Sequence, residues 1–470
     1  MKNGSGWIVL SYGIFLGWLL SFPYNGPVLL AAAAARDLSA GPFSLTYTIV
    51  PALFLTVFSF SVFTTREEYK RIVMIGCLLV CLAGTLIIFL VNTYWWFPVL
   101  SVMGVCSVTY IIYWSIYYTR QIPVPDKMKI MALVIITGNV IYYFFKLSLP
   151  YLSSTAVLLI LTSLLLLSLW TLLRMEIANP IQIPLESAPF PTRLIFIVCI
   201  FLFAVKLNGG LTFHVIYPSF DAMFGHMSQY YGMAPYILTL FFLYLRGHKL
   251  PKMLPVYLGT SFLGLAYLFF GMLEETMTMY FLTETLLQAG WAMLHLFLWT
   301  LFGEIASVYG RPLKICSLAF LSNLSAMVCG GILGIFIVEN VDNYYLMAST
   351  YAIFIVFICF LIVHWLNNSI EKDFIHKIQL HTAGLRTEEQ AAGLTGSLSL
   401  MINLPDADHL LTQREMEVAG LLLQGYTNET IANRLNISKN TIKSHTRSIY
   451  SKMSVANKRE LLQLACKKEN

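Results

Sequence analysis

The chain has 470 residues, of which 57% are hydrophobic and only 11% are charged, and its formal net charge is +6. An ordinary soluble domain carries about 25% charged residues. This composition excludes a water-soluble globular protein over most of the length, and it predicts that most of the chain lies in a lipid bilayer.

Twelve apolar runs are each long enough, at about twenty residues, to cross a bilayer as a helix. The first is long and continuous with the residues after it, so we expect a retained signal anchor rather than a cleaved signal peptide. A proline-rich loop between Arg174 and Arg193 divides the runs into two sets of six. The predicted spans are residues 7–29, 44–63, 72–91, 95–118, 130–149, 153–173, 194–213, 229–245, 253–273, 277–303, 315–338 and 344–366.

The loops between these spans alternate in charge. Loops after even-numbered spans carry most of the Lys and Arg residues, whereas loops after odd-numbered spans hold only Arg36 and, at a helix end, Lys146. Because basic loops remain on the cytoplasmic side, both chain ends are predicted to be cytoplasmic. The expected location is the bacterial cytoplasmic (inner) membrane.

Polar side chains within the spans are costly in lipid and are therefore candidates for a ligand site. On the tenth span Glu284, Gln288 and His295 share one helix face. Counting from the loop ends places Lys206 of the seventh span in the outer half, at the depth of Glu284, so these two residues could pair. A structural ion pair and a ligand contact both remain open. The candidate ligand-binding residues are Asn25, Lys206, Asn208, Glu284, Gln288 and His295.

Four aromatic residues gather near the cytoplasmic end of the fourth span. They are Tyr110, Tyr113, Trp114 and Tyr117. Tyrosine and tryptophan are enriched where a membrane helix meets the headgroups. We interpret this cluster as an aromatic belt rather than as a ligand cage.

The plan of six plus six spans with both ends inside resembles the major facilitator architecture. This resemblance implies that spans 1, 4, 7 and 10 line a central cavity. It is a resemblance of topology, because the inner-loop signature GxxxDRxGRR of that family is absent. The corresponding loops read TTREEYKR and RGHKLPK, which puts active transport in doubt.

After the last span the chain turns polar, with Gly384, Gly393, Gly396 and Pro405 among few apolar residues. Such a composition favours a flexible tether. We therefore expect an all-α protein in three parts. These are a twelve-span, facilitator-like membrane sensor domain at residues 1–366, a cytoplasmic linker at 367–405 and a four-helix DNA-binding domain at 406–470.

Four short helices with clear start signals are predicted in residues 411–465. Thr412 and Glu415 form a capping box at the first helix start. Asn428 and Ser438 are N-caps of the second and third helices. The short break before Ser438 predicts a helix, a tight turn and a helix.

The third of these helices has two different faces. Ile442, Ile449 and Met453 recur on one face and are predicted to point inward. No acidic residue occurs between Glu429 and Glu460, whereas this window holds many basic residues. A one-sided basic surface suits a polyanion. The opposite face of the helix carries Asn440, Lys443, Ser444, Arg447 and Ser451.

This segment resembles the helix-turn-helix of the LuxR (NarL/FixJ) type. The match to the pattern of that type runs without a gap. The matching residues are Leu411, Thr412, Arg414, Glu415, Glu417, Val418, Gly425, Thr427, Asn428, Ile431, Ala432, Leu435, Ile437, Ser438, Thr441, Lys443, His445, Ile449, Lys452, Val455 and Asn457.

The LuxR-type resemblance implies a role for individual residues on double-stranded DNA. By position, Lys443, Ser444 and Arg447 would face the major groove, while Thr441 and Lys452 would hold phosphates. The full predicted DNA-binding set is Lys439, Asn440, Thr441, Lys443, Ser444, Arg447 and Lys452.

The fourth helix of this segment is expected to mediate dimerisation. Related heads dimerise through this element, and here it offers Leu461, Leu462 and Ala465 as an apolar face. The resemblance therefore implies a homodimer on DNA.

Two hypotheses follow from the sequence. The first is a membrane-bound one-component transcription regulator that senses a small molecule and binds promoter DNA. The alternative is a facilitator-like secondary transporter with an attached regulatory DNA-binding head. No nucleophile-base or metal-ligand spacing occurs outside the membrane, so we expect no enzyme activity, catalytic residue, metal or cofactor.

Overall fold

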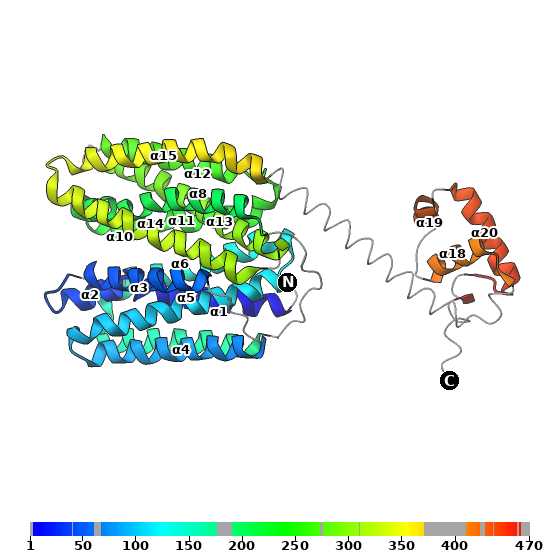
Figure 1. The fold of residues 1–470 in the computed structure, drawn as a ribbon, viewed down its shortest axis with the longest axis horizontal. Helices are drawn as coiled ribbons and strands as arrows, with labels where there is room; N and C mark the ends of the chain where they lie inside the picture. Colours follow the sequence, from blue (N-terminus) through cyan, green and yellow to red (C-terminus); the bar gives the residue numbers. More distant parts are fainter. Residues whose placement is uncertain are drawn as a thin grey trace. The chain divides into compact units, whose positions relative to one another are not determined.

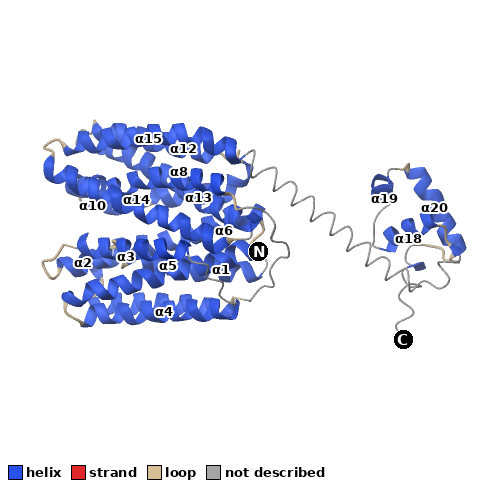
Figure 2. Ribbon diagram, in the orientation of Figure 1, coloured by secondary structure: helices blue, strands red, loops and turns tan. Residues whose placement is uncertain are grey.

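The computed structural model describes residues 3–39, 41–60, 67–175, 190–272, 276–309, 311–370, 410–423, 428–435, 437–457 and 460–461. Every regular element within these ranges is helical (Figure 2). The predicted all-α class is confirmed. The chain divides into two compact units, Met1–Phe374 and Ile375–Asn470, and most of the predicted linker at 367–405 lies outside the described residues.

The first half of the larger unit is a bundle whose helices pack side by side (Figure 1). Short 3-10 turns at Thr93–Trp95, Val124–Asp126 and Leu149–Tyr151 join some of them. The helices are α1 (Asn3–Ser21), α2 (Pro27–Ala34), α3 (Gly41–Phe60), α4 (Glu67–Leu90), α5 (Trp96–Gln121), α6 (Lys127–Ser148) and α7 (Ser154–Arg174).

The predicted first span, residues 7–29, is not one helix. Helix α1 ends at Ser21, and the chain turns through Asn25, whose φ of 52° lies in the left-handed region. A Cβ on Gly26 would lie 2.2 Å from the carbonyl carbon of Ser21, so only glycine fits there. Pro27 then begins α2, where its fixed φ and missing N–H cost nothing.

The second half repeats the pattern with two modifications. The seventh span runs on through a π-helix at Thr212–Ile216, and the predicted eighth span is split into α10 and α11. Its helices are α8 (Thr192–Leu211), α9 (Tyr217–Phe224), α10 (His226–Tyr231), α11 (Ala234–Arg246), α12 (Leu254–Gly271), α13 (Met277–Tyr309), α14 (Pro312–Asn340) and α15 (Tyr344–Ser369).

The larger unit has the length and surface of a membrane domain. Nine of its described helices are long and apolar enough to cross a bilayer. Three shorter apolar helices stand where the first, second and eighth spans were predicted, at Ser5–Ser21, Gly41–Thr56 and Ala234–Arg246. Large apolar side chains such as Leu90 and Phe357 are exposed, a surface that suits lipid rather than water. The chain is therefore a polytopic membrane protein.

The two halves meet through equivalent helices. Helix α3 packs against α14, and α6 packs against α11. In span numbers these are pairs 2 with 11 and 5 with 8, so exchanging the halves converts one pair into the other. This relation is the pseudo-twofold symmetry of a repeated six-helix fold.

Within the second half, α8 and α14 approach closely because glycines replace larger side chains. A Cβ on Gly330 would lie 2.1 Å from the carbonyl oxygen of Leu207, and a Cβ on Gly210 would lie 2.5 Å from the N atom of Gly331. Small residues let membrane helices make direct backbone contact. The position of α8, which carries Lys206, depends on this contact.

We expect Gly330→Ala to push α8 and α14 apart and to lower the free energy of unfolding by about 1–3 kcal/mol. Gly76→Ala on α4 is the matched control, because a Cβ at this position would have no atom within 4 Å and alanine is the better helix former. Thermal unfolding in lipid nanodiscs measures both. Equal melting temperatures for the two variants would contradict this packing argument.

Candidate functional site

The smaller unit holds three described helices around one apolar core. They are α18 (Gln413–Leu423), α19 (Asn428–Leu435) and α20 (Lys439–Lys452). The inward positions predicted for Ile442, Ile449 and Met453 are confirmed, because all three side chains are buried. The core consists of Leu411, Val418, Ala419, Leu422, Leu423, Ile431, Ala432, Ile442, Ile449, Met453 and Leu461.

Two of the three predicted helix caps, those at Thr412 and Ser438, are confirmed, whereas the predicted cap at Asn428 stays a prediction because Asn428 is the first described residue of α19. The Thr412 N–H donates to Glu415 Oε2 at 2.8 Å, and the Glu415 N–H donates to Thr412 Oγ1 at 3.3 Å. This reciprocal pair is the capping box of α18. At the start of α20 the Thr441 N–H donates to Ser438 Oγ at 3.1 Å, so Ser438 is the N-cap.

Glu415 does more than cap its helix. Its side chain is 5% exposed, and it accepts hydrogen bonds from Ser448 Oγ at 2.6 Å and from Lys452 Nζ at 2.7 Å. The Lys452 ammonium, then Ser448 and the backbone of Thr412, lower the pKa of Glu415 from its ordinary 4.5 to about 2. This carboxylate therefore joins the start of α18 to the end of α20.

Arg414, another residue of the sequence pattern, is also structural. Its guanidinium donates to the carbonyl oxygen of Leu435 at 3.1 Å. Leu435 is the last residue of α19, where carbonyl groups lack helical partners. Arg414 thus holds the end of α19 against α18.

The face of α20 that looks away from the core carries the basic and polar residues predicted to contact DNA. Lys443, Ser444 and Arg447 are exposed and lie on neighbouring turns, since positions four apart share a face. Lys439, Asn440 and Thr441 are exposed at the N-terminal end of the same helix. The described side chains of α20 thus place six of the seven predicted residues on one accessible surface.

Lys452 has a different setting from the other six. Its ammonium binds the buried carboxylate of Glu415, a partner 37 residues earlier in the chain. Thr441, the other expected phosphate contact, shares a 2.8 Å hydrogen bond with Ser438 Oγ. The structure therefore gives Lys452 an internal ion pair that spacing in the sequence does not reveal.

The larger unit encloses a cavity of about 260 Å³ between its two halves. Helices α1, α3, α5 and α6 contribute one wall, and α8 with the π-helix and α9 that continue it, α11, α13 and α14 contribute the other. Spans 1, 4, 7 and 10 all take part, as the facilitator-like topology implies. Most lining side chains are apolar or aromatic, which is typical of a small-molecule site.

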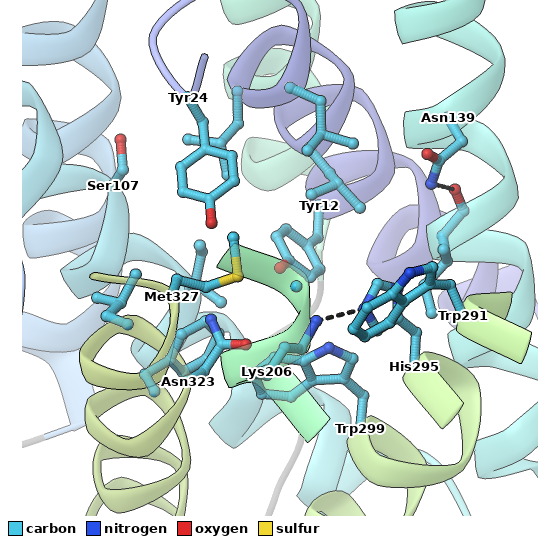
Figure 3. A pocket seen from close by; sticks show the side chains of 18 of the residues that line it. Tyr12, Tyr24, Ser107, Asn139, Lys206, Trp291, His295, Trp299, Asn323 and Met327 are labelled. Carbon is cyan, nitrogen blue, oxygen red and sulfur yellow. Dashed lines mark hydrogen bonds between the residues drawn. The ribbon is translucent and has the colours of Figure 1, made fainter. Parts of the chain in front are cut away.

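Lys206 lies at the centre of this cavity (Figure 3). Its side chain is 8% exposed, and its Nζ contacts Nε2 of His295 and lies 5.4 Å from the ring centre of Trp291. The other ring nitrogen of His295, Nδ1, lies 2.9 Å from the hydroxyl of Tyr236. Lys206, His295 and Tyr236 therefore form one hydrogen-bonded chain across α8, α13 and α11.

The expected pairing of Lys206 with Glu284 is wrong. Glu284 instead accepts a 2.8 Å hydrogen bond from Gln288, which also donates to the Tyr217 hydroxyl at 3.1 Å. The depth count failed because the seventh span continues to Phe224, so Lys206 is the fifteenth of its 33 residues rather than close to an outer end. This middle position matches His295, about 16 Å along α13 from Glu284.

The other candidate ligand residues fall into two groups, those that line the cavity and those that do not. Gln288 and His295 line the cavity together with Lys206. Asn208 points away from it, since its amide donates to the carbonyl of Ala352 on α15 at 3.1 Å. Asn25 lies in the turn after α1, and neither it nor Glu284 is among the residues that line the cavity.

Several cavity residues were not predicted. Trp291 and Trp299 stand four residues before and after His295 on α13, a spacing that could have marked one aromatic face. Tyr236 and Asn323 come from α11 and α14, which the topology did not assign to the cavity. Tyr12 on α1 is another of the unpredicted aromatic residues that line the cavity.

The interpretation of the fourth-span aromatics as a belt is wrong. Tyr110, Tyr113, Trp114 and Tyr117 are all buried inside the bundle. The Tyr110 hydroxyl donates to the carbonyl of Ser11 at 3.0 Å, and Trp114 Nε1 donates to another α1 carbonyl at 3.0 Å. These side chains tie α5 to α1, and Trp114 also lines the cavity.

We expect Glu415→Gln to lower the free energy of unfolding of the smaller unit, expressed as residues 375–470, by about 2–3 kcal/mol, because charge-assisted hydrogen bonds are lost. In the native unit the contribution of Glu415 is complete above about pH 4.5 and is lost as the pH falls towards 2, because folding lowers this pKa. Urea unfolding between pH 7 and pH 2.5 measures both effects.

Glu417→Gln is the control for this carboxylate. Glu417 is exposed and pairs with Arg414 one turn away, an arrangement worth about 0.5 kcal/mol. A loss of stability as large as that of Glu415→Gln, or an unchanged acid transition in Glu415→Gln, would contradict the role assigned to Glu415.

The smaller unit matches a known family of DNA-binding domains. Residues 409–465 match the luxR family of bacterial regulatory proteins. The chain is 41% identical over 70 residues to the HTH-type transcriptional regulator MalT of Vibrio cholerae. This match covers 14% of the chain and only 8% of MalT, so the likeness is confined to the head.

The larger unit is similar to solved transporter structures. The human organic anion transporter MFSD10 superposes with a TM-score of 0.58 at 12% identity, over 77% of this chain and 99% of that one. A bacterial homologue of ferroportin in the outward-facing state gives 0.58 at 14% identity, over 77% and 98%. The Major Facilitator Superfamily transporter FucP gives 0.53 at 12%, over 76% and 98%.

The superpositions establish the fold. The sequence identities are too low to establish the activity. The helix pairing between the halves and the cavity that both halves line agree with that fold. The chain thus carries a LuxR-family helix-turn-helix DNA-binding domain at its C-terminal end and a polytopic helical domain of the major facilitator fold before it.

Proposed function

We propose that this protein is a membrane-integrated one-component transcription regulator. The facilitator-fold domain binds a small molecule, and the LuxR-type head binds promoter DNA. The observation that supports this proposal is the presence of both domains on one polypeptide, with a mostly apolar cavity between the two halves of the membrane domain. A ligand that binds one arrangement of the halves more tightly raises the population of that arrangement. The head is then attached to a membrane domain in a different conformation.

The proposed orientation brings the head to the DNA. The alternation of basic loops supports cytoplasmic chain ends in a bacterial inner membrane. Lys443 and Arg447 project from α20 away from the core, and neither forms an ion pair with another described residue. These cations are available to base edges and phosphates in the major groove.

We further propose that two heads bind together, because one recognition helix covers only a few base pairs. Leu461 does not belong to the dimer face expected from the sequence, since it is 0% exposed within the core of its own head. The other two residues of that predicted face, Leu462 and Ala465, lie outside the described residues.

We expect Lys443→Ala and Arg447→Ala each to weaken specific promoter binding by about 1–3 kcal/mol. Gln413→Ala is the control, because Gln413 is exposed on α18 away from this surface. Gel-shift and footprinting assays on a promoter found by genomic footprinting measure affinity and the number of half-sites. Full affinity in the double variant would remove these residues from the interface, and full-affinity binding to one half-site would exclude the paired arrangement.

The facilitator fold itself favours a second function, in which the membrane domain transports its ligand and the head is regulatory. Transport requires the cavity to open alternately to the two sides of the membrane. Sensing requires only that the ligand bind one of two conformations more tightly than the other. Uptake by proteoliposomes therefore separates the two functions. A regulator should bind its ligand without flux, and net uptake at rates typical of carriers would favour the transporter.

Removal of one cavity hydroxyl should alter signalling without altering DNA binding. We expect Tyr236→Phe to raise the ligand concentration for half-maximal reporter response about fivefold or more, because one buried hydrogen bond is worth about 1 kcal/mol or more. Tyr280→Phe is the control, since Tyr280 is a buried tyrosine outside the cavity lining. An unchanged response in Tyr236→Phe, at equal membrane levels, would count against this cavity as the sensory site.

A further inference from the structure

The charged side chains that line the cavity are of one sign, positive, among the described residues. Among the described residues that line it, Lys206 is the single Lys, Arg, Asp or Glu. The neighbouring acid Glu284 is engaged with Gln288 nearer the end of α13, and Lys206 contacts no carboxylate among the described residues. A buried ammonium without a counter-ion is costly in a low-dielectric interior.

The hydrogen-bonded chain around Lys206 adds a second donor. A Lys206 ammonium donates to Nε2 of His295, so the proton of that ring lies on Nδ1 and is donated to the oxygen of Tyr236. The hydroxyl proton of Tyr236 is then free to be donated elsewhere. Lys206 and Tyr236 thus present two N–H or O–H donors to an acceptor in the cavity.

A third polar group lies on the α14 wall. Figure 3 shows Lys206 between His295 and Asn323. The Oδ1 atom of Asn323 is buried and has no hydrogen-bond partner among the described groups. A buried polar atom without a partner indicates a missing ligand or water.

The rest of the cavity suits a flat apolar body. Tyr12, Trp114, Trp291 and Trp299 supply aromatic faces from both halves of the domain. Aromatic rings stack or meet edge to face with other rings at about 0.5–1.5 kcal/mol beyond simple burial. The polar groups therefore hold one end of a ligand while the rings surround the other.

From this arrangement we infer that the cavity binds an amphipathic organic anion, with its carboxylate accepting hydrogen bonds from Lys206 and Tyr236 and its aromatic body lying among the tryptophans. The inference names the ligand class of the site in the proposed function. The carboxylate supplies the counter-charge that the lining lacks, and a protonated oxygen or a hydroxyl on the ligand can meet Asn323. An amine or a neutral amide lacks this complementarity.

Calorimetric titration of the full-length protein in nanodiscs tests the inference with three probes of one shape: 3-phenylpropanoate, 3-phenylpropanamide and 3-phenylpropan-1-amine. We expect the carboxylate to bind about tenfold or more tightly than the amide, as for a charge-assisted hydrogen bond. Lys206→Met should bring this ratio close to one, and Lys206→Arg should restore part of it. Lys146→Met, which removes a lysine outside the cavity lining, should leave it unchanged.

The ratio of two affinities separates recognition from mere destabilisation, which weakens both probes alike. If Lys206→Met does not fold, Asn323→Asp decides, because an added acid beside Lys206 should lower the preference for the carboxylate. Equal affinities for carboxylate and amide in the wild type, or an undiminished preference in Lys206→Met or Asn323→Asp, would overturn the inference.

A reporter assay with the same probes distinguishes this inference from the proposed function. A carboxylate preference that depends on Lys206 but leaves transcription unchanged supports the ligand class and counts against the regulator. A transcriptional response to the amine or amide that equals the response to the carboxylate supports a regulator and overturns the ligand class.

Discussion

The membrane domain depends on one constraint: a polar group away from water must find its partner inside the protein. The Lys206 ammonium, near the middle of its span, meets this constraint only partly among the described residues, through His295 and the face of Trp291. Tyr110 and Trp114 of α5 meet it fully, because the Tyr110 O–H and the Trp114 N–H donate to carbonyl groups of α1. Fully satisfied groups hold helices together, and the partly satisfied one lies in the cavity between the two halves.

A buried polar group in the head, which is not embedded in lipid, also needs partners inside the protein. Glu415 is buried, and its carboxylate is held by Thr412, Ser448 and Lys452 from both ends of the domain. Residues that the family pattern shares, Glu415 and Arg414 among them, therefore build the frame of the helix-turn-helix. Lys443 and Arg447 on α20 form no ion pair with the residues that the structure describes, so their charges are accessible to a phosphate backbone.

The proposed function requires that a ligand affect how the two halves of the membrane domain are arranged. The halves of the membrane domain touch through the pairs α3 with α14 and α6 with α11, and the cavity takes its lining from both halves. A ligand that contacts Lys206 on α8 and Trp114 on α5 would contribute binding energy to one relative arrangement of the halves. Close glycine packing holds α8 directly against α14 within the second half.

The sequence by itself determined the elements whose signals are local. Apolar length located the spans, capping residues located the starts of α18 and α20, and periodicity identified Ile442, Ile449 and Met453 as core. Tertiary structure alone decided the pairings between distant segments. Lys206 meets His295 rather than Glu284 because the seventh span extends to Phe224, and Lys452 meets Glu415 across the fold of the head. Composition reports which groups need a partner, and only the packing of helices decides which partner lies within reach.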